Sequence, residues 1–321
     1  MVDISIQVEG QDGLTWSGWK RWVTEVEALG FAGLFRSDHF TNARPPDKDS
    51  LETIVSLTYL ADHTQRIHFG PLVSPLSFRD PMLFVRQAAA LDDLSNGRMI
   101  LGVGAGWQER EHTLFGLDLG DIPTRMMRLE EGLEVMTRLL HSDEPVTYEG
   151  QIYQLRGATL LPRPQRPGGP RVMIGGNGVK RTLPLVVRYG DIWNAAFLAP
   201  DAFRERSTHL DMLLHDAGRE PNSVKRTVMS PLFFGRDMDE LDQRLQWRHK
   251  RPDLADKSLD EAIDTLSRNG VIVGTPDRII SQIHTFAEAG VEEIMLMQYG
   301  NPDESVIEVL QILAERVLPQ V

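Results

Sequence analysis

Short apolar segments and longer amphipathic segments alternate along nearly the whole chain. Residues 4–8 alternate apolar and polar side chains, which is typical of a strand with one buried face. Residues 16–29 carry apolar side chains at helical spacing and stop before Gly30, a frequent helix terminator. Residues 98–103 are almost continuously apolar, as a parallel strand covered on both sides is. The same pattern predicts eight strands, over residues 4–8, 33–35, 66–73, 98–103, 172–174, 192–194, 224–233 and 293–297.

A helix is predicted after each strand, which favours a closed (β/α)8 barrel, the TIM-barrel fold. These helices span residues 16–29, about 50–62 with Ser50 as the cap, 80–94, 125–140, 180–188, 201–217, 277–289 and 305–317, with an additional one at 259–268. The alternative is a doubly wound open sheet. That fold usually begins with a glycine-rich dinucleotide loop after the first strand, and residues 9–13, Glu-Gly-Gln-Asp-Gly, do not form one.

Two excursions interrupt the alternation within what we expect to be a single domain over residues 1–321. The first, about residues 144–170, contains a hairpin signal at 148–153 and a proline-rich segment. The second, about residues 235–274, is charged and helical. Excursions from a barrel usually cover the active-site mouth, so we expect both near the carboxyl ends of the strands.

Composition excludes several classes of function. The chain has no cysteine, which excludes disulfides, thiolate metal sites and a cysteine nucleophile. The net charge of −12 disfavours nucleic-acid binding. No apolar run approaches the roughly 18 residues that span a bilayer, and the first residues do not resemble a signal peptide, so we expect a cytoplasmic protein. The nine histidines lack metal-ligand spacing, and we expect no metal.

Catalytic groups of such a barrel lie where strands end. The second strand ends in Ser37-Asp38-His39-Phe40, where an acid beside an imidazole could polarise a carbonyl or move a proton near neutral pH. The alternative is an aspartate that caps a loop beside an exposed histidine. The third strand ends at residues 70–75, where small and β-branched residues could let the backbone press against a flat ligand, or simply form a core strand and a proline turn.

Glycines mark the ends of the next two strands. Residues 102–107, Gly-Val-Gly-Ala-Gly-Trp, lack the third glycine of a dinucleotide loop but expose bare backbone. Residues 174–178, Ile-Gly-Gly-Asn-Gly, precede a helix that begins with Lys180 and Arg181. Backbone N–H groups at a helix amino terminus form an anion site, so this segment favours phosphate binding over a plain tight turn.

Taken together, these strand ends resemble the luciferase-like monooxygenase superfamily, which has the (β/α)8 fold. The resemblance covers nearly the whole chain in order: residues 37–40, 97–107, 148–153, 174–183 and 191–194. Within it, the segment from Ala105 to His112 and the helix start at 180–183 are most similar to the branch that uses the deazaflavin coenzyme F420. The family's sugar-phosphate dehydrogenases have a glutamate where this chain has Trp107 and a tryptophan where it has Ala43, which disfavours a sugar-phosphate substrate.

The resemblance implies a specific set of cofactor contacts. It implies a cis peptide bond between Leu72 and Val73 beneath the ring, Asp38 beside the ring, and His39 on the substrate side. The full set of implied cofactor-binding residues is Asp38, Leu72, Val73, Ala105, Gly106, Trp107, Gly175, Gly176, Asn177 and Gly178, of which the last four would bind the phosphate. His39 is the predicted proton-transfer residue.

The predicted function is that of an oxidoreductase moving a hydride between F420 and a small organic substrate. One alternative is an FMN-dependent monooxygenase that takes reduced flavin from a partner reductase and reacts with O2. Another is a barrel that binds a flavin without turnover. The resemblance further implies a homodimer.

Overall fold

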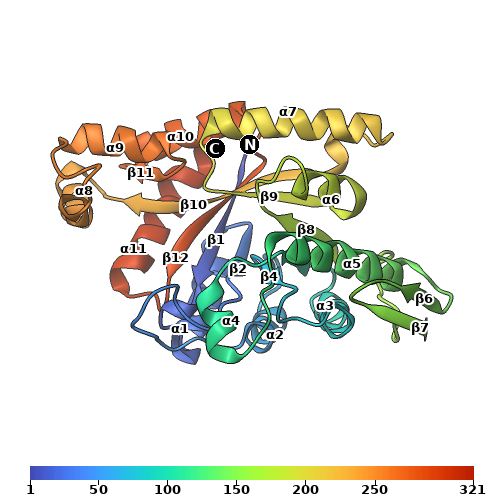
Figure 1. Cartoon of the computed structure of the whole chain (residues 1–321). Helices are drawn as coiled ribbons and strands as arrows, with labels where there is room; N and C mark the ends of the chain where they lie inside the picture. The colour runs from blue at the N-terminus through green and yellow to red at the C-terminus, as the bar shows by residue number, and fades with distance from the viewer.

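The structure, a computed structural model, describes residues 1–321 and contains a parallel sheet wrapped into a barrel with helices outside it (Figure 1). The strands lie side by side in the order β3-β2-β1-β12-β10-β9-β8-β5-β4. A parallel bridge between Phe69 and Met99 joins the two ends of this order, so the predicted (β/α)8 barrel is confirmed. The barrel strands are β1 (Asp3–Glu9), β2 (Gly33–Arg36), β3 (His68–Pro71) continued by β4 (Ser74–Pro75), β5 (Ile100–Gly104), β8 (Arg171–Gly175), β9 (Ile192–Ala196), β10 (Lys225–Phe234) and β12 (Glu293–Tyr299).

The helices begin where the sequence offers caps. Thr15 caps α1, and Asp80 caps α3 with proline at its first position. The predicted cap Ser50 is wrong: Glu52 caps α2, and the Ser50 hydroxyl donates to the carbonyl of His39 instead. The helices that surround the barrel are α1 (Trp16–Ala28), α2 (Thr53–His63), α3 (Pro81–Leu94), α5 (Ile122–His141), α6 (Thr182–Tyr189), α7 (Pro200–Asp216), α10 (Pro276–Glu288) and α11 (Glu304–Ile312).

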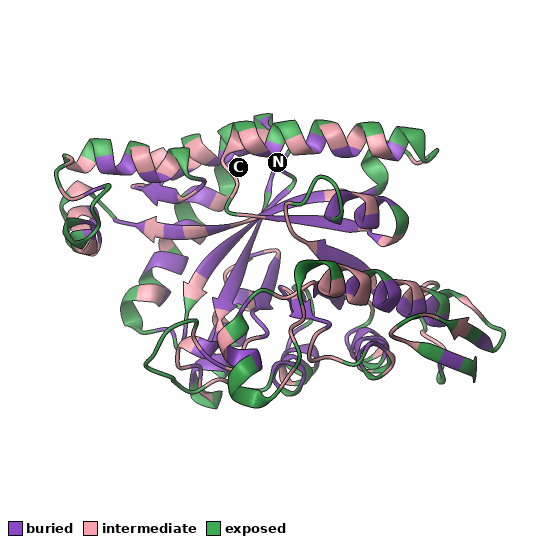
Figure 2. Cartoon of the chain, viewed as in Figure 1, coloured by how far each residue is buried: buried purple, intermediate pink, exposed green.

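The barrel strands have one face toward the barrel interior and the other toward the surrounding helices. A core cluster of 64 buried residues extends from Val2 to Val321 and includes Ile4, Ile6 and Val8 of β1. A separate cluster joins Phe35, Leu72, Ile100, Met173, Ile192 and Met295, which come from strands all around the barrel and therefore meet inside it. The strands are consequently buried on both faces, as their colour in Figure 2 shows.

The first excursion forms the predicted hairpin, β6 (Val146–Glu149) with β7 (Gln154–Ala158), but none of its residues lines the cavity at the mouth of the barrel. The amides of residues 151, 152 and 153 donate to Glu131 on α5, and the hairpin lies beside that helix (Figure 1). Arg163 and Arg166 then bind groups near the carboxyl ends of α5 and α3. Because these helices run opposite to the strands, those ends lie away from the mouth. The expectation that this excursion covers the mouth is therefore corrected.

The second excursion extends the sheet rather than covering the barrel. It contains α8 (Met238–Arg244), α9 (Leu259–Arg268) and β11 (Ile272–Gly274), and β11 pairs with the carboxyl end of β10. Seven buried residues give it a small core of its own. The pattern of apolar residues missed β11, which is only three residues long, and α4 (Glu109–Phe115), which has too few residues for a periodic stripe. None of the helices is apolar over a length that would cross a membrane.

Candidate active site

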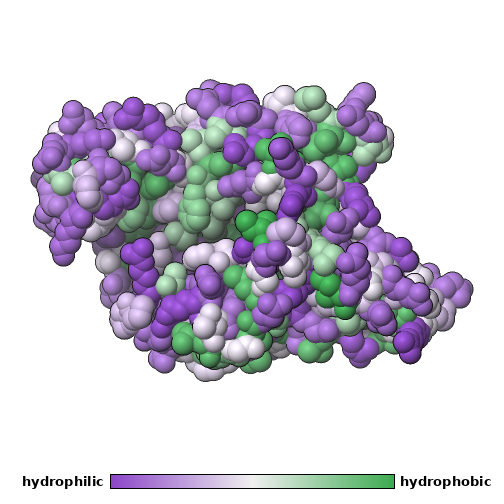
Figure 3. Space-filling model, viewed as in Figure 1, coloured by the Kyte–Doolittle hydropathy of each residue, from purple (hydrophilic) through white to green (hydrophobic).

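A cavity of about 730 Å³ opens at the carboxyl ends of the barrel strands. It is lined by residues from β1, β5, β8, β9, β10 and β12, from the loop that follows β2 and from the segment between β3 and β4, so all eight barrel strands contribute to it. Apolar side chains gather around the hollow in the middle of the face in Figure 3. Neither excursion contributes a lining residue.

The floor of the cavity is the irregular segment between β3 and β4. The Leu72–Val73 peptide bond is cis, as the family resemblance implied, and both residues line the cavity. A Cβ atom added to Gly104 would lie 2.6 Å from Val73 Cγ2, and one added to Gly175 would lie 3.0 Å from it. The glycines at the ends of β5 and β8 therefore make room for Val73. This close approach gives a physical reason for two of the glycine signals in the sequence.

Asp38 does not face the cavity, which corrects the expectation that it lies beside the ring. Its carboxylate accepts two hydrogen bonds from Arg79, at 2.7 and 2.8 Å, and one from the Ser74 hydroxyl at 2.6 Å. Burial by itself raises the pKa of Asp38, but the bonds and charge of Arg79, together with Ser74, outweigh it and hold this pKa below its usual value. Asp38 thus ties the end of β2 to the floor segment.

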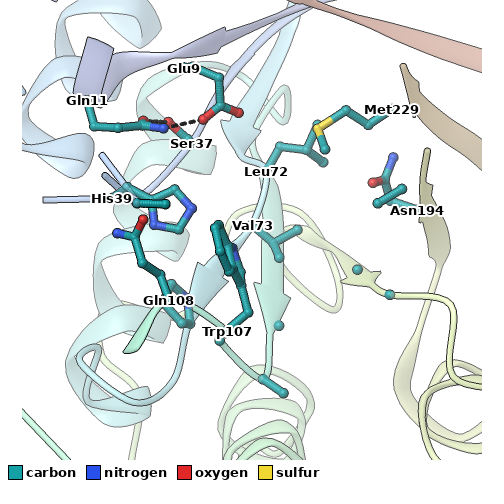
Figure 4. A pocket seen from close by; sticks show the side chains of 18 of the residues that line it. Glu9, Gln11, Ser37, His39, Leu72, Val73, Trp107, Gln108, Asn194 and Met229 are labelled. Carbon is teal, nitrogen blue, oxygen red and sulfur yellow. Dashed lines mark hydrogen bonds between the residues drawn. The ribbon is translucent and has the colours of Figure 1, made fainter. Parts of the chain in front are cut away.

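His39 points into the cavity (Figure 4). Behind it lies Glu111, a residue that no sequence pattern singled out. His39 Nδ1 lies 2.8 Å from Glu111 Oε1, and the Phe40 amide donates to the other Glu111 oxygen at 3.0 Å. Only 1% of the Glu111 side chain is exposed. Helix α4 positions this carboxylate 72 residues away along the chain, so no local motif signalled the pair.

The Glu111 carboxylate fixes the chemistry of the imidazole. With Nδ1–H donated to Glu111, Nε2 has no partner in the protein and is left for a ligand. Burial by itself lowers the pKa of His39, but the hydrogen bond and charge of Glu111 outweigh it and raise the pKa above its usual value. The imidazole can therefore exchange a proton with a group in the cavity near neutral pH.

A second polar group lies at the end of β1. Glu9, Gln11 and Ser37 all line the cavity, and hydrogen bonds connect them in sequence (Figure 4). The Ser37 hydroxyl donates to Gln11 Oε1 at 2.6 Å, and the Gln11 amide donates to Glu9. No pattern within residues 9–13 signalled this polar group, because the segment only fails to match a dinucleotide loop.

Ala105, Gly106 and Trp107 line one side of the cavity after β5. The indole of Trp107 is 63% exposed and meets the His39 ring edge to face, with the ring centroids 5.7 Å apart. Trp107 therefore flanks the imidazole at the mouth. The other lining residues that sequence analysis did not single out include Gln108, Thr182, Asn194, Phe197, Met229, Met297 and Tyr299.

The glycine-rich loop after β8 divides into two parts. Gly175 and Gly176 line the cavity, but the Gly176 amide already donates to the Asn194 carbonyl. Asn177 and Gly178 do not line it, and the Asn177 side chain bonds both the amide and the carbonyl of Ala196. The amides of residues 177–181 donate to no protein acceptor, and they immediately precede α6.

The basic residues of this loop are placed differently from the sequence expectation. Lys180 and Arg181 line a separate depression between α5 and α6 and not the main cavity. The helix begins at Thr182, two residues later than predicted. Any anion held here would therefore be bound chiefly by backbone amides.

Comparison with known proteins places this site in a family. A family model described as luciferase-like monooxygenase matches residues 3–293. The chain belongs to this family.

Luciferase-like relatives of the chain include both dehydrogenases and monooxygenases. An F420-dependent glucose-6-phosphate dehydrogenase of Amycolatopsis mediterranei is 25% identical over 93% of this chain and 92% of its own length. A 4-hydroxyprotoasukamycin monooxygenase of Streptomyces nodosus subsp. asukaensis is 30% identical over 71% of this chain and 58% of its own.

A solved structure shares the whole luciferase-like barrel. That of an F420-dependent secondary alcohol dehydrogenase in complex with an F420-acetone adduct matches with a TM-score of 0.83, at 21% identity, over 100% of this chain and 99% of that one. The last match establishes the fold, and the family establishes that the protein is an enzyme.

Proposed function

We propose that this enzyme binds coenzyme F420 and moves a hydride between it and a small organic substrate. The observation that carries the proposal is the imidazole of His39. It is held from behind by the buried Glu111, and its Nε2 is left without a protein partner at the wall of the cavity. A non-catalytic flavin-binding barrel has no need of such a pair.

The residues present fit a flat ring with an anionic tail. The cavity has a floor of Leu72 and Val73, and bare backbone at Gly106 and Gly175 allows close approach. The unused amides of residues 177–181 before α6 provide donors for a phosphate. Two of the relatives carry F420 in their names, the dehydrogenase of Amycolatopsis mediterranei and the secondary alcohol dehydrogenase.

The protein's own part of the reaction is to orient the substrate and move a proton. Bound F420 supplies the hydride exchange. His39 Nε2 gives a proton to the substrate oxygen when a carbonyl is reduced, and takes it when an alcohol is oxidised. Glu111 keeps Nδ1 protonated and stabilises the imidazolium that forms when Nε2 takes the proton. Asp38 does not take part, because Arg79 and Ser74 occupy its carboxylate.

Titration of the apo-protein with F420 and with FMN, followed by fluorescence quenching, tests the choice of cofactor. Tighter binding of F420, together with its reduction or oxidation by a small alcohol or carbonyl compound, supports the proposal. Tighter binding of FMN and consumption of O2 with reduced FMN from a reductase would instead identify a monooxygenase. Binding without any turnover would identify a non-catalytic barrel.

The anion site has a test of its own. Gly178→Asp introduces a carboxylate beside the free amides, and Gly178→Ala adds a Cβ at the same place without the charge. Either Cβ would lie 2.8 Å from the Thr182 hydroxyl, so the pair isolates the effect of the charge. We expect Gly178→Asp to weaken F420 binding far more than Gly178→Ala does, and neither to affect a deazaflavin that lacks the phosphate tail. Equal F420 binding by the two variants would mean that the phosphate binds at another site.

The assembly we expect in solution is a homodimer. Light scattering coupled to size-exclusion chromatography measures it, and a mass of one chain would contradict it. The expected location is cytoplasmic.

A further inference from the structure

We propose that the substrate is an uncharged or cationic organic molecule that carries a hydroxyl or amino group, and that Glu9 selects it by accepting a hydrogen bond from that group. The inference deepens the proposed function and rests on the cavity being the active site. Three observations support it: the charges that line the cavity, the use already made of the nearby cations, and the way Glu9 is held.

Apart from the titratable His39, the charged side chains on the wall of the cavity are carboxylates. None of its 24 lining residues is lysine or arginine, whereas Glu9 and Glu111 are both among them. Glu111 is committed to the His39 imidazole and the Phe40 amide. Glu9 is therefore the carboxylate that remains to meet a substrate.

Several cations near the cavity are already bound to other groups. Arg36 is buried and donates to the Leu51 carbonyl and the Ser56 hydroxyl, each at 2.7 Å. Arg79 is shared between Asp38 and Glu52. On the outer loops, Lys48 pairs with Asp12 and Arg110 with Asp47. A phosphate or carboxylate on the substrate would thus find no lysine or arginine on the cavity wall to pair with, which is costly in a partly buried site.

Glu9 is held so that its carboxylate stays in the cavity. It is the last residue of β1, and Gln7 on the same strand donates to one of its oxygens at 2.9 Å. Gln11 donates to the other oxygen, and Ser37, itself bonded by the Gly10 amide, holds Gln11 in place. Each carboxylate oxygen therefore has one protein donor and can accept another. No cation pairs with this carboxylate, and Figure 4 shows it at the cavity wall above His39.

The rest of the wall suits an apolar body attached to that polar group. Met229, Met297, Phe197 and the exposed Trp107 all line the cavity. A substrate held between these side chains and Glu9 buries its hydrocarbon part and hydrogen-bonds at one end. The site therefore favours neutral or cationic alcohols, and their carbonyl counterparts, over phosphorylated sugars.

A matched series of three cyclohexanols tests the inference. They are trans-4-aminocyclohexanol, trans-1,4-cyclohexanediol and trans-4-hydroxycyclohexanecarboxylate, which share one carbinol and differ in the charge of the distal group. Calorimetry measures the Kd of each for the protein loaded with whichever of F420 and FMN it binds. We expect the amine and the diol to bind at least about tenfold more tightly than the carboxylate, the scale on which unlike and like charges are discriminated.

Glu9→Gln keeps the shape and removes the charge, so it should shrink the ratio of amine to carboxylate affinity by about tenfold. Asp12→Asn is the matched control, because it removes a charge three residues away whose carboxylate faces Lys48 and not the cavity. That variant should keep the ranking of the wild type. A carboxylate that binds as tightly as the amine, an unchanged ranking in Glu9→Gln, or no binding by any of the three overturns the inference.

The turnover of the same compounds separates this inference from the proposed function. The expected ranking in binding, without any change in F420 absorbance, contradicts the proposed function and leaves the inference standing. Turnover of the carboxylate in preference to the amine supports the proposed function and contradicts the inference.

Discussion

Asp38 and His39 are neighbours at the end of β2, and each belongs to a pair that contains a buried carboxylate. The carboxylate has a different role in the two pairs. At Asp38, the buried carboxylate meets Arg79, a cation that never gives up its proton, and the pair ties β2 to the cavity floor. At His39, the buried carboxylate of Glu111 meets an imidazole whose proton can leave near neutral pH. The partner of a buried carboxylate therefore decides whether it stabilises the fold or prepares a proton transfer.

The largest effect is expected at the first of these two sites. Arg79→Met leaves the Asp38 charge buried without its cation, and we expect a loss of about 3–5 kcal/mol in the free energy of unfolding. Denaturant titration measures it, with Arg204→Met as the control, since the exposed pair with Asp201 contributes little. The pKa of Asp38 is lowered in the folded protein, so its stabilisation is present above the unfolded pKa and disappears as pH falls through the folded one. A variant that loses no more stability than the control would contradict this role.

The second largest effect is expected from removing the His39 imidazole, which is the titrating partner of Glu111. His39→Asn keeps a polar side chain but loses proton exchange, and turnover should fall about a hundredfold, the usual scale for a general acid or base. Steady-state kinetics measures the fall, and fluorescence quenching should find cofactor affinity nearly unchanged. If affinity collapses together with turnover, His39 is a binding residue and the contrast with Asp38 fails.

A smaller effect is expected from neutralising Glu111 while keeping its shape. Glu111→Gln removes the charge that raises the pKa of His39, and we expect a loss of about tenfold in kcat/KM, within the range for weakening acid–base catalysis. The limb of the pH profile that His39 controls should move to lower pH. Because the pKa of His39 is raised on folding, the pair stabilises the protein below the unfolded pKa, and this contribution is lost as pH rises through the folded pKa. An unmoved limb would show that Glu111 has only a structural role.

The smallest effect is expected at Ser74. Ser74→Ala removes one of three hydrogen bonds to the Asp38 carboxylate and leaves both Arg79 bonds, so we expect a loss of about 1–2 kcal/mol. Thermal unfolding measures the loss. The pH profile of turnover should coincide with that of the wild type, and a shifted profile would mean that the Asp38 site is coupled to the chemistry after all.

Sequence reasoning predicted the barrel well because its signals are local. Apolar runs such as residues 98–103, glycine stops and proline at the first turn of α3 depend on the identities of near neighbours. The sequence-based predictions failed in two local cases. Strand β11 is too short to show a pattern, and Glu52 rather than the predicted Ser50 caps α2. The position of the hairpin was wrong because the bonds from its turn to Glu131 connect residues about 20 apart, which no periodicity reveals.

By itself, the sequence determined the strand and helix alternation, the absence of cysteine chemistry, and the convergence of residues near 38, 72, 105 and 175 at one end of a barrel. Only the tertiary structure decided which of two adjacent side chains faces the cavity, that Glu111 from α4 lies behind His39, and that Glu9 has no cation. The reason is physical. Periodicity reports which face of an element is buried. Pairing between side chains far apart in the chain depends on how the elements pack, as the bonds of Asp38 with Arg79, 41 residues apart, and of His39 with Glu111, 72 residues apart, illustrate.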